Sequence, residues 1–264
     1  MTQDRRSPAP ARIQVDGVGF DPLDQSAAIE RLISSFHRGV GGRVVFVNLD
    51  VLVKMRRRPE LTGLVSPAEL VFADGMPVIW ASRLQRTPLP ERVAGASLLG
   101  QIAARCAADG IPVMLLGGRP GCAERAVAAL EAAHPALRAG WHAPPYGFED
   151  DPGAGEAIDG ALEGFGRGVC FVGLGFPKQE RLMADLAAKR PDWWFVASGG
   201  SIDFLAHDDR APIWMQQAGL EWLYRLRREP RRLARRYLIE DLPFAVRLLL
   251  AAFLGGLRHR RSRS

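Results

Sequence analysis

The chain has 264 residues, of which 47% are hydrophobic and 24% are charged, and its net charge is +6. It is long and apolar enough for one well-packed domain with an appendage, which excludes a chain that is disordered over most of its length. We expect disorder only at 1–11 and 258–264, which are polar and rich in Pro or Arg. The positive charge is concentrated in the segment 211–264, which holds 12 arginines and four acidic residues. Such a segment attracts phosphate groups of lipids, nucleic acids or nucleotides.

Four short apolar runs alternate with segments that carry apolar residues at spacings of three and four. The runs are typical of buried strands because they end at glycine or polar residues, and the other segments are typical of helices. The predicted strands are 43–48, 111–116, 168–172 and 193–197, and the predicted helices are 24–37, 97–109, 122–134 and 177–189. This alternation indicates parallel βαβ units with helices on both faces of one sheet. The sequence therefore predicts an α/β fold with a Rossmann-like core, which we place at residues 12–206.

Glycines follow three of the predicted strands. In an open parallel sheet, ligands bind outside the carboxyl ends of the strands, and glycine there lets backbone amides approach a phosphate closely. At any single strand the glycines could simply turn the chain. Three sites on one edge favour a shared nucleotide crevice. The glycines are Gly117, Gly118, Gly173, Gly175, Gly199 and Gly200.

The sharpest local signal follows the third strand, where Pro177, Lys178 and Gln179 come after Gly175. Proline suits the first turn of a helix, and a helix N-terminus attracts anions through its free amides and its dipole. A lysine there is unfavourable unless an anion lies nearby. Lys178 is therefore a candidate phosphate ligand, and the alternative is a solvated first turn.

Asp74 follows the apolar run 70–72 and precedes Pro77. It could cap the helix that begins near Pro77, or it could act as a general base at a strand end. The residues alone leave both interpretations open.

Other catalytic motifs are absent from the sequence, which has no GxxxxGK[ST], no GxGxxG after a strand, no HExxH and no GxSxG. A nucleotide-binding oxidoreductase would need the dinucleotide fingerprint and an acid on the ribose. Two acidic clusters, 149–151 and 207–209, could hold a metal, but such loop clusters are usually solvated, so we expect no metal site.

Three separated cysteines, Cys106, Cys122 and Cys170, show neither metal-ligand spacing nor a disulfide framework and indicate a reducing compartment. The N-terminus has no apolar signal region, and no run reaches the roughly 18 apolar residues of a membrane span. We therefore expect a cytoplasmic protein that can lie on a membrane.

After residue 203 no further strand is predicted, and we expect helices at 211–226 and 230–257, interrupted at Pro230 and Pro243. These helices mix arginines with Trp, Tyr and Leu, as helices in a lipid interface do, and the arginines attract anionic lipid. The alternative is a pair of helices packed on the body with a solvated arginine face. We predict a basic, membrane-associating appendage at 207–257. A nucleic-acid-binding protein would also explain the arginines, but not the glycine-ended strands or Asp74.

Several strings occur in order between about Ile13 and Arg247. The most specific are GLGFPKQE at 173–180 and GLEWLYR at 219–225, accompanied by ADGMP at 73–77 and PERVAG at 90–95. Together they resemble the WecG/TagA/CpsF family, which is glycosyltransferase family 26.

The resemblance implies an inverting transfer of a hexose from a UDP-sugar to an undecaprenyl-diphosphate-linked sugar, on the inner face of the membrane, with no metal or other cofactor required. It implies that Asp74 is the catalytic base and that the C-terminal arginines engage the membrane and the diphosphate. The residues that we expect to bind substrate are Asn48, Arg92, Gly117, Gly118, Gly173, Gly175, Lys178, Gln179, Gly199, Gly200, Asp203, Arg210, Arg225, Arg228 and Arg232.

Two positions depart from the family pattern. The family often has an acid where this chain has Ser97, and some members have Thr where it has Phe46. Either change can alter the choice of sugar, so N-acetylmannosamine and another hexose such as glucose are both compatible. Capsule, exopolysaccharide, common-antigen and teichoic acid synthesis are all compatible too, as is a homo-oligomer. No nucleic-acid partner is expected.

Overall fold

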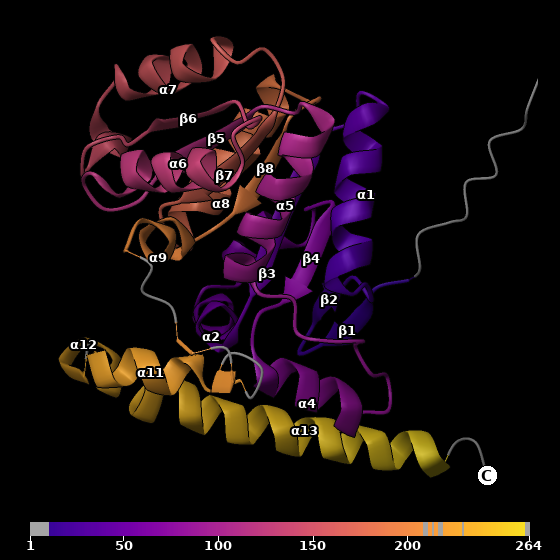
Figure 1. Cartoon of the computed structure of the whole chain (residues 1–264). Coiled ribbons are helices and arrows are strands. Elements are labelled where there is room, and N and C mark those ends of the chain that lie inside the picture. The colour runs from indigo at the N-terminus through magenta and orange to yellow at the C-terminus, as the bar shows by residue number, and fades with distance from the viewer. Residues whose placement is uncertain (1–10, 208–210, 213, 216–218, 229, 262–264) are drawn as a thin grey trace, which may run out of the picture.

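A six-stranded parallel sheet forms the centre of the computed structural model, which describes residues 11–207, 211–212, 214–215, 219–228 and 230–261 (Figure 1). The strand order is β4-β3-β8-β7-β5-β6, and every pairing is parallel. The strands are β3 (Gly42–Val47), β4 (Leu70–Ala73), β5 (Val113–Gly117), β6 (Ala139–His142), β7 (Val169–Gly173) and β8 (Trp194–Ala197). The predicted α/β, Rossmann-like core is confirmed.

Helices surround this sheet. The helix α8 packs on β3, β7 and β8, whereas α6 packs on β5 and β6, and α1 lies beside α5 (Figure 1). The four predicted strands and four predicted helices are confirmed to within two residues at each end. The helices before residue 208 are α1 (Gln25–His37), α2 (Leu49–Arg57), η1 (Pro59–Leu61), α3 (Thr62–Val65), α4 (Met76–Leu84), α5 (Gly95–Asp109), α6 (Cys122–Ala133), η2 (Phe148–Asp150), α7 (Ala154–Glu163), α8 (Lys178–Lys189) and α9 (Ser201–His207).

Apart from Arg43 in β3, the core strands are apolar along their whole length because both faces of the sheet are covered. Every residue of β3, β4, β5, β7 and β8 is buried, with Phe72, Phe171 and Phe195 among the largest side chains that are almost wholly enclosed. The sequence did not predict the edge strand β6. It also did not predict the antiparallel hairpin of β1 (Ile13–Val15) and β2 (Val18–Phe20). They are short and only partly buried, so they lack a continuous apolar run.

The C-terminal tail comprises α11 (Glu221–Arg228), α12 (Pro230–Ala234), the π-helical segment η3 (Arg235–Asp241) and α13 (Leu242–Arg261). Two expectations for this tail were wrong. Gly219 has a positive φ of 71° and separates the helical residues 214–215 from α11, so 211–226 is not one helix. The helix α13 also continues through 258–261, part of the segment for which composition predicted disorder. Pro243 is the second residue of α13, which begins directly after the π-helical η3, so the helical form changes beside this proline as expected.

The tail lies along the carboxyl ends of the strands, with α13 beneath α4 and η3 beside α2 (Figure 1). Leu248 and Ala252 of α13 join the core of the body. The approach is close at Gly256, where an added Cβ would lie 2.2 Å from the carbonyl oxygen of Leu84. Within the described residues, no helix is both long enough and apolar enough to cross a membrane.

Candidate active site

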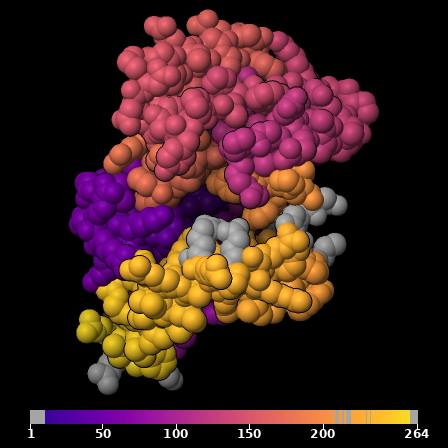
Figure 2. Space-filling view, turned by 90° about the vertical axis from the view of Figure 1, so that its left-hand side faces the viewer, coloured from indigo at the N-terminus to yellow at the C-terminus, as the bar shows by residue number. Residues whose placement is uncertain are grey.

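Five neighbouring strands end at one edge of the sheet and bring most of the predicted site residues together. Asp74 follows β4, Asn48 follows β3, and the three glycine pairs follow β8, β7 and β5. Because these glycine-ended strands are adjacent, the expectation that they share one edge is confirmed. The surface is hollowed between the yellow tail and the magenta-to-orange upper body (Figure 2).

Asp74 lies where the body meets the tail. Its backbone N–H donates to the carbonyl oxygen of Val47 at 3.0 Å, which ties the end of β4 to the end of β3. Gly75 takes the N-cap position of α4, so Asp74 stands one residue outside the cap. Its side chain is 29% exposed and can therefore be reached by a substrate.

Arg92 stands between Asp74 and the tail. Its Nη1 lies 3.7 Å from Oδ1 of Asp74 and 3.1 Å from Oε2 of Glu221, the first residue of α11. A partly buried guanidinium between two carboxylates fixes both of them in place. Glu221 belongs to the GLEWLYR string, but the sequence did not predict its contact with Arg92.

Asn48 caps α2, since its side-chain oxygen accepts a hydrogen bond from the N–H of Val51 at 3.2 Å. An added Cβ on Gly75 would lie 3.7 Å from Cβ of Asn48, so the turns after β3 and β4 are in contact range. The cap bond uses only the carbonyl oxygen of the amide. Among the described residues, the two N–H groups of Asn48 make no hydrogen bond, and they lie at the same edge as Asp74.

The glycine turns approach each other too closely for side chains. The N–H of Gly118 donates to the carbonyl oxygen of Gly173 at 2.8 Å. Gly117 has a φ of 99°, and an added Cβ there would lie 2.7 Å from the same oxygen. Glycine is thus required by the backbone at this point. Gly199 and Gly200 form the turn between β8 and α9.

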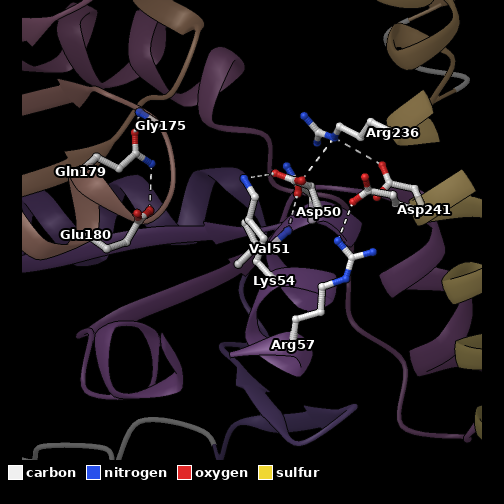
Figure 3. Close-up of polar contacts among 11 residues, drawn as sticks. Asp50, Val51, Lys54, Arg57, Gly175, Gln179, Glu180, Arg236 and Asp241 are labelled. Atoms are coloured by element: carbon white, nitrogen blue, oxygen red, sulfur yellow. Dashed lines mark hydrogen bonds and ion pairs between the residues drawn. The ribbon is translucent and has the colours of Figure 1, made fainter. Parts of the chain in front are cut away.

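Gln179 is buried beneath these turns. Its Oε1 accepts a hydrogen bond from the N–H of Gly199 at 3.2 Å. The same oxygen accepts from the N–H of Gly175 at 3.1 Å, and Nε2 donates to Glu180 at 2.8 Å (Figure 3). All three contacts are internal. The structure thus brings Gln179 to the predicted edge as a residue that holds two turns together.

Asp203 holds the third turn. Its Oδ1 accepts from the N–H of Arg119 at 2.8 Å and its Oδ2 accepts from Nε of Arg119 at 3.0 Å. Asp203 belongs to α9, which follows β8, and Arg119 follows β5. The turns after β5, β7 and β8 are therefore joined into one framework.

Lys178 lies in the first turn of α8, as predicted, but its partner is a carboxylate. It forms an ion pair with Glu149 and lies 5.3 Å above the ring of Tyr146. The hydrogen bond to Glu149 raises the pKa of Lys178 above its usual value, so the side chain is charged. Nothing in the sequence indicated this pairing, which depends on the packing of 146–149 against α8.

The tail arginines are placed unevenly. Arg225 stacks on Phe204 of α9 at 4.6 Å, next to Asp203, and Arg228 lies 5.4 Å from the ring of Tyr224. Arg210 lies outside the described residues, and the structure describes the backbone of Arg232 in α12 but not its side chain. Arg225 thus contacts an element of the carboxyl edge.

Phe46 and Ser97, the two departures from the family pattern, lie close to each other in the fold. Phe46 is buried at the end of β3, 6.1 Å from the ring of Phe72. An added Cβ on Gly95, in the first turn of α5, would lie 3.2 Å from the Phe46 ring, and Ser97 follows in the same helix. The buried Phe46 side chain therefore packs below the carboxyl edge of the sheet, against Phe72 and the first turn of α5.

Two further hollows lie along α2, and neither is lined by a residue of the glycine turns. One is lined by Val53, Arg57, Glu240, Phe244 and Arg247, among others, and the second by residues that include Asp16, Met55 and Thr62. Within the described residues, no three His, Cys, Asp or Glu side chains form a cluster that could hold a metal ion. Residues 208 and 209 of one acidic cluster lie outside that range.

One known protein family matches almost the whole chain. The model of the family described as "Glycosyl transferase WecG/TagA/CpsF family" matches residues 13–257. The match covers the hairpin, the sheet and the tail, so it includes every element that lines the carboxyl edge.

Proposed function

Because the chain belongs to the WecG/TagA/CpsF glycosyltransferase family, whose members act in cell-surface polysaccharide biosynthesis, we propose that sugar transfer takes place at the carboxyl edge of the sheet. The donor is a UDP-sugar and the acceptor is a sugar linked to undecaprenyl diphosphate. The observation that carries this proposal is the contact of Arg92 with both Asp74 and Glu221, which places a reachable carboxylate between the glycine turns and the tail.

Asp74 is the general base in this mechanism. It takes the proton of the acceptor hydroxyl, whose oxygen forms a bond to the anomeric carbon as the bond to UDP breaks on the opposite face. The electron pair leaves with UDP, and the anomeric configuration inverts. General-base assistance of this kind contributes about 10²–10⁴-fold to a rate. Asn48, one strand away, is placed to bind substrate beside Asp74.

The negative charge on the leaving UDP needs fixed donors and cations. We assign this role to the backbone N–H groups of the turns that contain Gly118, Gly175 and Gly200, and to the N-terminus of α8. Lys178 joins them by leaving Glu149 when the diphosphate binds. Arg225 and Arg228, with Arg210 and Arg232, approach from the tail. No metal or other cofactor takes part in this scheme.

The tail brings the lipid-linked acceptor to the edge. Its exposed apolar residues recur every three or four positions along α13 and so form one stripe. The stripe consists of Leu242, Val246, Leu250, Phe253, Leu254 and Leu257. With arginines around it, this surface suits the inner face of the cell membrane, where anionic lipid attracts positive charge. In this proposal 12–206 is the catalytic core and 207–257 the membrane-associating appendage.

A donor screen tests the proposal. Full-length protein is incubated with a short-chain lipid-diphosphate-sugar acceptor and a panel of UDP-sugars that includes UDP-N-acetylmannosamine and UDP-glucose, and transfer is followed by product mass. One donor should give a product with inverted configuration. No product with any donor, together with no uptake of UDP in calorimetry, would contradict the proposal. Salt-sensitive binding of DNA under the same conditions would favour a nucleic-acid-binding protein instead.

A further inference from the structure

Gln179 can hold the two glycine turns in only one orientation of its side-chain amide. With Oε1 toward Gly175 and Gly199, it accepts two backbone N–H bonds. Rotated by half a turn, it would present its own N–H groups to these donors, and both bonds would be lost. An acceptor that binds Nε2 strengthens this preference, because it would face Oε1 if the amide were rotated.

Glu180 is that acceptor. Its Oε1 lies 2.8 Å from Nε2 of Gln179, and the residue is 1% exposed (Figure 3). Its second oxygen, Oε2, is buried and makes no hydrogen bond to any described residue. A buried carboxyl with one satisfied oxygen is costly, since the charged form loses its hydration.

The surroundings of Glu180 control its charge. Burial raises the pKa of Glu180 to about 7, against the opposing effect of its bonds to Gln179 and the backbone and of the positive charge of Lys54. Lys54 itself pairs with Asp50 at 2.9 Å, and Asp50 lies 3.4 Å from Nε of Arg236 in the tail. Both protonation states of Glu180 keep an oxygen that can accept from Gln179.

We propose that Glu180 is a positioning residue for the donor site: it orients the amide of Gln179, which then holds the turns after β7 and β8 at the spacing that binds the diphosphate. This inference depends on the proposed function, because it takes these turns to be the UDP site. Glu180 acts through Gln179 and touches no substrate.

Replacing Glu180 by methionine tests this role, since methionine has a similar length and no acceptor oxygen. We expect Glu180→Met to raise both the KM for the UDP-sugar and the Kd for UDP by about tenfold, which is the typical effect of losing a buried hydrogen bond. The value of kcat should stay within about threefold, because the turns bind the donor in its ground state as well. Glu180→Gln restores an acceptor and should bring KM close to that of the unchanged protein.

Glu124→Met is the matched control, because Glu124 is an exposed glutamate in the first turn of α6. It should leave KM unchanged. An unchanged KM in Glu180→Met, or an equal loss in Glu180→Gln, would overturn the inference. If Glu180→Met does not fold, Gln179→Met removes the same link and should raise KM similarly, and an unchanged KM there would also overturn it. Failure of the unchanged protein to bind UDP would contradict the proposed function itself.

Discussion

The glycine turns and the C-terminal tail meet at one edge of the sheet but are held by different forces. The turns are joined mainly by partly buried hydrogen bonds among backbone groups and Gln179, with one exposed ion pair between Asp203 and Arg119. The tail is held on α2 by ion pairs at the surface, such as Arg57 with Glu240 at 2.8 Å, and by a few apolar side chains of α13. Buried hydrogen bonds are little affected by salt, whereas exposed ion pairs are screened by it. The donor site is therefore expected to be rigid, and the acceptor side adjustable.

The largest effect is expected at Asp74, where the two regions meet. Asp74→Asn removes the base and should lower kcat by about 10²-fold or more, while the protein folds normally. Steady-state transfer assays and the melting temperature check both parts. Asp185→Asn, at an exposed position of α8, is the control and should retain full activity. A rate near that of the unchanged protein would remove Asp74 from the mechanism.

The next effect concerns Glu180 below the glycine turns and the dependence of protein stability on pH. Burial raises the pKa of Glu180 to about 7 in the folded chain, above its value when unfolded, so the folded state binds more protons between these values. The free energy of unfolding should therefore fall as pH rises from about 4.5 to about 7, by up to roughly 3 kcal/mol from this group.

Denaturant unfolding at a series of pH values measures this dependence. Asp241 adds to it in the same direction, because burial raises its pKa to about 6. Glu180→Gln should flatten the part of the curve that reaches pH 7, and a curve that keeps its shape in this variant would contradict the assignment.

The third effect concerns the apolar stripe of α13. Replacing Leu250 and Phe253 by glutamate puts charge where lipid is expected, so binding to anionic vesicles should fall by at least about tenfold. Sedimentation with vesicles measures this loss. Val40→Glu changes an equally exposed apolar residue before β3 and should have no effect. Unaltered sedimentation of the Leu250 and Phe253 variant would exclude the stripe as the membrane surface.

The smallest effect is expected at the junction of tail and body. Glu221→Gln weakens one of the two contacts of Arg92, whose guanidinium can then close on the proton-accepting oxygen of Asp74. We expect a decrease of kcat by about fivefold, which is the equivalent of the roughly 1 kcal/mol of a partly exposed ion pair. Transfer assays at low and high salt would show whether screening abolishes the difference between the two proteins.

The sequence by itself determined the α/β class and most of the elements that carry the site. Apolar β-branched runs fix strands locally, and the glycines at 117, 173 and 199 mark where backbones must pass closely. Each of these signals is local, because it depends on only a few consecutive residues. The short edge strand β6 and the β1–β2 hairpin were missed because their burial depends on neighbours that are distant in sequence.

Only the tertiary structure decided how these pieces meet. The strand order β4-β3-β8-β7-β5-β6 places the turns after β7 and β8 side by side, where Gln179 can bond to both. The contacts of Arg92 with Glu221, of Lys178 with Glu149 and of Arg236 with Asp50 join residues up to 186 positions apart. No periodicity or local propensity encodes such pairs, because they arise when whole elements pack and each buried polar group finds the partner that remains within reach.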